Sequence, residues 1–137
     1  MPVIKTYSAL VTELNNRVSI AVENACNRLL GTLQEMIDSE FYDQFTPEYY
    51  QRTYQFWRSA TTRMLNSTCG EILMDENLMH YTDGWTGEKQ IRAAAEGYHG
   101  KWDRTEGRFW ESFVDYCEAN AREILKEELG KQGINVK

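Results

Sequence analysis

The stretch from residue 8 to residue 39, SALVTELNNRVSIAVENACNRLLGTLQEMIDS, predicts the largest element of the fold. Apolar residues recur in it at intervals of three and four, which places them on one side of an α-helix: Leu10, Leu14, Val18, Ala21, Ala25, Leu29, Leu33 and Met36. Gly31 either weakens this helix by about 1 kcal/mol relative to alanine or marks a kink. A helix of about thirty residues is roughly 45 Å long, more than the width of a globule of this size. We therefore expect part of it to pack on another subunit.

A small sheet is predicted by the segment that starts at residue 60. Two short strand-like runs, 61–65 and 71–74, flank the turn-rich stretch 66–70 and suit a hairpin. A second turn, Asp75-Glu76-Asn77, precedes a third run from Leu78 to Tyr81. We expect these three strands to form an antiparallel sheet with one face against a helix.

Two more helices are predicted in the C-terminal half, separated by a charged loop at 98–108. The first covers 88–97, and the second starts near Phe109 and stops at Gly130 and Gly133. The apolar stripe of the second consists of Phe109, Phe113, Tyr116, Cys117, Asn120, Ile124 and Leu129. The expected class is α+β, with a long N-terminal helix and a C-terminal helix packed on a small antiparallel β-sheet. At 137 residues, the chain has room for a single domain, 1–137.

Aromatic residues are dense between residues 41 and 59, FYDQFTPEYYQRTYQFWRS. Pro47 favours an extended conformation at the residue before it, so the first helix should end by then. Beyond it, the spacing fits a helix or a strand equally well. Amphipathic rings in this density are typical of a core edge or a protein contact. We expect a subunit interface that combines this run with the later aromatics: Tyr50, Tyr54, Trp57, Tyr98, Trp102, Phe109 and Trp110.

Composition argues against several classes of protein. A net charge of −6 and a pI near 5.0 give no electrostatic reason to bind nucleic acid, although scattered basic residues could line a channel that passes DNA: Arg52, Arg58, Arg63, Lys101, Arg104 and Arg108. Solvated side chains and ion pairs between subunits are the preferred interpretation of these residues. No apolar stretch approaches the roughly 20 residues that a membrane helix needs. The N-terminus shows no signal peptide, so folding in the cytoplasm is expected.

The search for chemistry gives weak candidates. The chain has an odd number of cysteines, three, and no CxxC pair: Cys26, Cys69 and Cys117. Reduced, half-buried thiols are therefore expected. His80 and His99 have no short-spaced ligand pair beside them, and no phosphate loop or nucleophile elbow occurs. We expect no catalytic residue, cofactor or metal, hence no enzyme.

Two alternatives of other classes remain open. A small carbohydrate- or ligand-binding module would use the aromatic-rich region 85–110, with rings from Trp85, Tyr98, Trp102, Phe109 and Trp110 and carboxylates from Asp83, Asp103 and Glu106. Core and interface packing is preferred for these rings. A hydrolase using Cys117 and His99 is the least favoured, because Cys117 lies on the apolar stripe of its helix.

The aromatic run also carries a family resemblance. Tyr42, Pro47, Tyr49, Tyr50, Arg52, Thr53 and Tyr54, followed by Ser59, resemble a segment of the head–tail joining, or tail-completion, proteins of tailed phages and prophages. Tyr98-His99-Gly100 and Phe109-Trp110 resemble later parts of the same family.

This resemblance implies a structural virion protein without catalytic turnover. Such a protein forms a homo-oligomeric ring, with a hexamer as the leading expectation, and joins the tail to the head. Its partners would be a portal-side connector protein and a tail-tube or tail-terminator protein, and nucleic acid would matter only as DNA that passes through the ring. It would be made and assembled in the cytoplasm of the bacterial host and end in the virion.

Overall fold

The computed structural model describes residues 6–40, 55–81, 84–95, 98–99, 103–104 and 108–137. Its first helix, α1 (Tyr7–Glu40), has 34 residues and confirms the predicted long helix. It begins after Thr6, whose hydroxyl accepts a hydrogen bond from the backbone N–H of Ala9 at 3.1 Å, as a helix cap does. The helix continues through Gly31 without a break.

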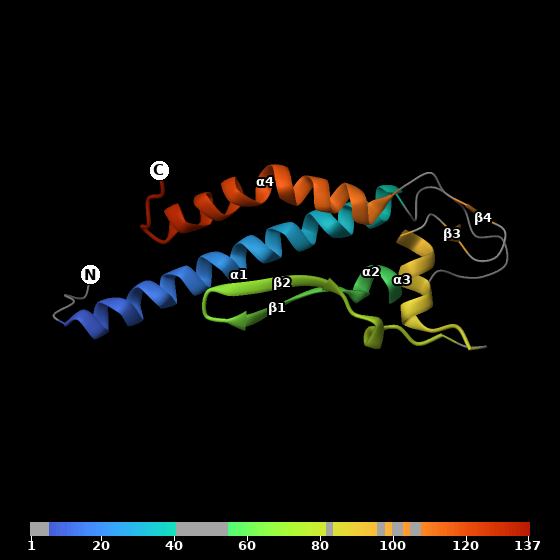
Figure 1. The fold of residues 1–137 in the computed structure, drawn as a ribbon, viewed down its shortest axis with the longest axis horizontal. Coiled ribbons are helices and arrows are strands. Elements are labelled where there is room, and N and C mark those ends of the chain that lie inside the picture. Colours follow the sequence, from blue (N-terminus) through green and yellow to red (C-terminus); the bar gives the residue numbers. More distant parts are fainter. Residues whose placement is uncertain (1–5, 41–54, 82–83, 96–97, 100–102, 105–107) are drawn as a thin grey trace.

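Three layers follow from the position of α1 in the middle (Figure 1). The second long helix, α4 (Phe109–Lys131), lies along one side of α1 and runs in the opposite direction. The hairpin of β1 (Ala60–Asn66) and β2 (Cys69–Met74) lies along the other side. The predicted α+β class is confirmed, with the refinement that α4 packs chiefly on α1.

The β1–β2 hairpin forms where the sequence predicted it. The strands pair antiparallel, with Ala60 opposite Met74 and Arg63 opposite Glu71, and an irregularity follows Met64. At the turn, the side chain of Asn66 accepts a hydrogen bond from the backbone N–H of Thr68 at 2.9 Å, a local bond typical of turns.

Glycine at position 70 lets the hairpin approach α1 closely. A Cβ added at Gly70 would lie 2.7 Å from the Sγ of Cys26, which is closer than real Cβ atoms come. The strand and the helix are therefore in contact where glycine lacks a side chain.

The predicted third strand, Leu78 to Tyr81, is wrong. A 3-10 turn, η2 (Glu76–Leu78), stands there, and residues 79–81 are not in a strand. The Asp75 carboxylate accepts from the N–H of Asn77, and the N–H groups of Leu78 and Met79 bond to carbonyls of Asp75 and Glu76. Because the turn uses these donors, they are not available to a sheet.

The remaining elements are short and lie toward the end of the molecule that is opposite the start of α1 (Figure 1). They are α2 (Gln55–Ser59), α3 (Gly87–Ala95), and a two-residue antiparallel pairing of β3 (Tyr98–His99) with β4 (Asp103–Arg104). Helix α3 confirms the predicted helix, whose last two positions, 96–97, lie outside the described residues. The sequence predicted a loop where β3 and β4 pair.

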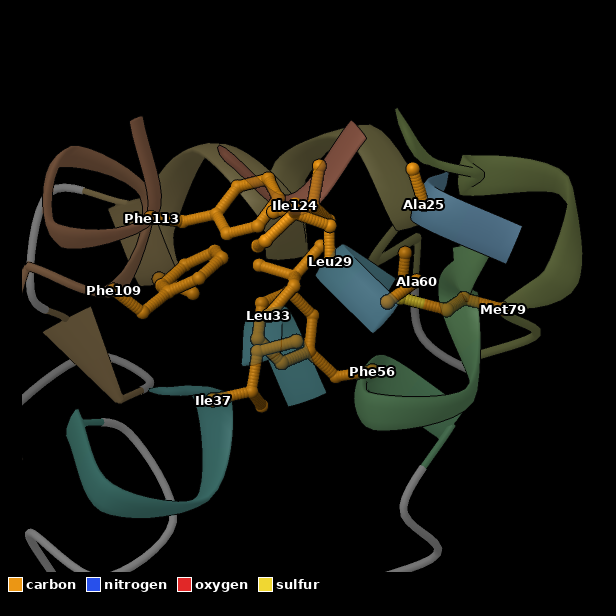
Figure 2. Close-up of a cluster of buried hydrophobic side chains, with 11 residues drawn as sticks. Ala25, Leu29, Leu33, Ile37, Phe56, Ala60, Met79, Phe109, Phe113 and Ile124 are labelled. Atoms are coloured by element: carbon orange, nitrogen blue, oxygen red, sulfur yellow. The ribbon is translucent and has the colours of Figure 1, made fainter. Parts of the chain in front are cut away.

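The core is built on the C-terminal half of α1 (Figure 2). Its buried members are Ala25, Leu29, Leu33, Ile37, Phe56, Ala60, Met79, Ala94, Phe109, Phe113 and Ile124. Ile37 is fully buried, while the predicted Met36 beside it is half-buried. In the described residues, no helix has the length and apolar character that a membrane span requires.

Candidate subunit interface

The aromatic side chains gather where α2 meets the start of α4 (Figure 2). The rings of Phe56 and Phe109 meet edge to face, with centroids 5.3 Å apart and planes at 90°. Trp110 lies 6.3 Å from Phe109 and 5.8 Å from Phe113, measured between ring centroids. Such geometries add roughly 0.5–1.5 kcal/mol per pair to the burial of the rings. This cluster joins the aromatic run to the C-terminal helix.

The structure divides the predicted interface residues into three groups. Phe109 is 1% exposed and belongs to the core of the single chain, which corrects its expected place at a subunit surface. Trp57 and Trp110 are half-buried and pack against that core, each with some surface left open. Tyr50, Tyr54 and Trp102 lie outside the described residues, and for Tyr98 only the backbone, in β3, is described.

In the described residues, the rings considered for sugar stacking do not form one array. Phe109 is buried and Trp110 packs between Phe109 and Phe113. Trp85 is exposed before α3, where its indole Nε1 donates to the Oε1 of Gln90 at 2.9 Å. A stacking platform needs coplanar exposed rings, and Phe109 and Trp110 do not provide them.

The cysteines differ in surroundings more than the sequence indicated. Cys26 is buried, Cys117 is half-buried and Cys69 is exposed, and all three are free thiols. Burial raises the pKa of the Cys117 thiol, and therefore disfavours the thiolate that a nucleophile requires. The side chain of His99, its suggested partner, lies outside the described residues. Within the described ranges, no three metal-binding side chains gather at one place.

A charged network fixes α4 against α1. Arg28 on α1 donates to Glu127 at 2.9 Å and to Glu128 at 3.2 Å, and Lys131 donates to Glu128 at 2.9 Å. Glu128 is 3% exposed. The hydrogen bond from Lys131, with a second from Arg28, outweighs burial and lowers the pKa of the Glu128 carboxyl. The hydrogen bond that Arg28 donates to Glu127 raises the pKa of the Arg28 guanidinium.

Two other contacts support the same helix pairing near its ends. The Ser112 hydroxyl donates to Glu40 Oε1 at 2.9 Å, where α1 ends and α4 begins. At the opposite end, Arg17 donates to the carbonyl of Gln132 at 3.3 Å and to Glu13 at 2.9 Å. These contacts define how far α4 reaches along α1.

The start of α1 extends past the end of α4 and past the hairpin turn (Figure 1). Three of its apolar residues are open: Tyr7 is 82% exposed, Leu10 is 40% and Leu14 is 43%. They continue the stripe whose later members, Ala21 to Leu33, form the core. Because the described part of the chain leaves this stretch uncovered, it is the candidate subunit interface.

The sequence pattern gave no indication that Phe56, Ser59 and Glu128 are buried. Phe56 lies in a run of other aromatic residues, which does not single it out as buried. Ser59 is polar, and its hydroxyl donates a hydrogen bond to the Phe56 carbonyl. Glu128 has acidic neighbours in the sequence, Glu118, Glu123 and Glu127, a composition typical of a solvated face. Its position beside the apolar Leu129 gives no signal of burial. The ion pair that accompanies this burial comes from Arg28, in a distant part of the chain.

Comparison with known proteins bears on the class. A family model described as YomN matches residues 6–132. The chain belongs to the YomN family. The prophage-type name of the YomN family indicates a phage-associated protein. A search of curated proteins and a search of solved structures gave no match to this YomN-family chain.

Proposed function

We propose that the chain is a structural virion protein of a tailed phage or prophage, which forms a ring that completes the tail and joins it to the head connector. The observation that carries the proposal is membership of a phage-associated family over residues 6–132. The resemblance of the aromatic run to head–tail joining proteins supports the finer role. In this role the chain is not an enzyme, and it reaches the virion after synthesis in the host cytoplasm.

The candidate subunit interface supports an oligomer. A helix that presents Tyr7, Leu10 and Leu14 to solvent exposes apolar surface that a neighbouring subunit would cover. In a ring, each subunit contacts the next through two different patches, so the start of α1 would pack on another part of its neighbour. A hexamer is the copy number proposed, with a connector protein and a tail-tube or tail-terminator protein on the two sides.

A deletion in an inducible prophage tests the role. Particles made without the chain are expected to be separate heads and tails in electron micrographs, and infectivity returns when the gene is supplied in trans. Mass spectrometry of purified wild-type particles should detect the chain. Intact, infectious particles from the deletion strain, together with absence of the chain from wild-type particles, would exclude a structural role.

A further inference from the structure

One row of side chains on the outward face of α4 carries charges of both signs in two separate blocks, and the exposed Glu123 and Glu127 lie outside this row. Acidic residues occupy the first half of one row along the helix and basic residues occupy the second half. Successive members are three or four positions apart, so they lie on one face: Glu111, Asp115, Glu118, Arg122 and Lys126. The first four are exposed and Lys126 is half-buried, whereas Phe113 and Ile124 on the opposite face are buried.

A recess lies at the basic end of this row. It has a volume of about 200 Å³ and is formed between α4 and the C-terminal segment. Leu125, Leu129 and Val136 give it apolar walls. Its charged border consists of three basic residues and one acidic residue: Arg122, Lys126, Lys137 and Glu123. At the acidic end, Val114 is 38% exposed beside Asp115. Each end of the row therefore pairs a charge with an apolar feature, one concave and one protruding.

The helix dipole does not account for the whole arrangement. A dipole favours acids in the first turn and bases in the last turn of a helix. Glu111 fits that rule, but Asp115 and Glu118 lie in later turns, and Arg122 lies well before the end of α4 at Lys131. Among the described residues, no ion pair is found for any member of the row, including the neighbours Glu118 and Arg122.

We propose that this face of α4 binds the same face of a second copy of the chain in an antiparallel, two-fold contact. With the two-fold axis passing near residue 120, each Glu118 meets Arg122 of the second copy and each Asp115 meets Lys126 of the second copy. Val114 then reaches the recess beside Lys126 of the second copy. Every contact occurs twice, because a two-fold interface uses the same patch on both chains.

Charge complementarity selects a second copy over other partners. A purely acidic partner, nucleic acid included, would be repelled by the three carboxylates, and a purely basic one by Arg122 and Lys126. A partner with the same two blocks in reverse order satisfies both, and an antiparallel copy has that order. The contact differs from the head-to-tail contacts of a ring, so it stands independently of the proposed function.

Two charge reversals test the contact. Glu118→Arg places arginine opposite Arg122 of an identical copy, and Arg122→Glu places glutamate opposite Glu118 of an identical copy. In sedimentation equilibrium, each variant alone should self-associate at least about tenfold more weakly than the natural chain, because like charges then face each other. Mixed in equal amounts, the two variants should form a one-to-one heterodimer, since both contacts then join opposite charges.

The mixing step separates contact between copies from an effect within the helix. Glu118 and Arg122 are also four residues apart on one chain, but that relation is the same in the mixture as in each variant alone. Glu76→Arg, an exposed reversal in η2, is the matched control and should associate like the natural chain.

Three results would overturn the proposal. The first is unchanged association of both variants alone, and the second is their failure to associate when mixed while each keeps its helical circular dichroism. The third is a natural chain that stays monomeric up to about 1 mM, where even weak specific contacts are populated.

Discussion

Leu33 and Leu14 are the same type of residue on the same helix in opposite surroundings. Leu33 is fully buried in the core, whereas Leu14 is 43% exposed on the part of α1 that the described chain leaves uncovered. The periodic pattern placed both on one stripe, because spacing reports which residues share a face and not what covers that face. Burial along the stripe depends on how far α4 and the hairpin extend, and the sequence does not state this.

We expect Leu33→Ala to lower the free energy of unfolding by about 2–5 kcal/mol, the usual cost of emptying a packed site. Leu14→Ala is the matched control and should cost less than about 1 kcal/mol in the monomer, as surface changes do. Chemical denaturation of both variants measures the difference. Equal losses would show that the two leucines have similar surroundings.

Glu128 gives a prediction for pH at the same scale. Its carboxyl pKa is lowered from 4.5, chiefly by the hydrogen bond from Lys131, so the folded state favours the charged form. A lowered pKa stabilises the fold above the unfolded value, and this contribution disappears as pH falls through the folded value. At pH 7, Glu128→Gln should therefore be less stable than the natural chain, and the gap should narrow below about pH 4.5.

Denaturation curves of the two proteins across this range measure the gap. Glu127→Gln is the control, because the Glu127 side chain is 58% exposed. Within the described part of the chain, its ion pair is with Arg28. A gap for Glu128→Gln that stays constant down to pH 3 would contradict the role of its charge.

At the scale of elements, the local signals explain what could be predicted. The helix over 8–39, the turn at 66–70 and the helix from Phe109 all depend on residues close in sequence, and the structure has them at nearly the same bounds. The third strand failed because an Asx turn at Asp75 competes with strand pairing for backbone donors. The pairing of β3 with β4 and the burial of Phe56 depend on distant contacts, which spacing does not report.

Two glycines in helices should respond to alanine in opposite ways. A Cβ at Gly31 would meet nothing within 4 Å, so Gly31→Ala should raise the free energy of unfolding by about 0.5–1 kcal/mol, the gain in helix propensity. A Cβ at Gly87 would overlap the backbone of Glu76, so Gly87→Ala should be destabilising. Thermal melts of both variants test this.

The Gly31→Ala variant also tests the alternative interpretation of Gly31 as a kink. A kink that assembly requires would make Gly31→Ala lose oligomers while its helix content stayed intact. We expect instead that Gly31→Ala assembles like the natural chain, because α1 is already continuous through this position.

At the scale of the whole molecule, the two long helices produce two distinct surfaces. The start of α1 is apolar and reaches past its neighbours (Figure 1), while one row on the outward face of α4 is charged in two blocks. One charged pair, Glu13 with Arg17, lies close to the apolar start of α1, and its members neutralise each other. The apolar surface can therefore approach another subunit without strong repulsion despite the net charge of −6.

Leu14→Glu tests whether the apolar surface carries the proposed ring. A charge at the centre of a contact must be desolvated without a partner, so we expect higher oligomers to be lost. The melting temperature of the monomer should change little, because Leu14 is 43% exposed there. Leu65→Glu is the control: Leu65 is an exposed leucine on the hairpin, 54% open, and its variant should still assemble. Light scattering at matched concentrations compares the two. If Leu65→Glu lost oligomers and Leu14→Glu kept them, the ring contact would lie on the hairpin, and the start of α1 would have another role.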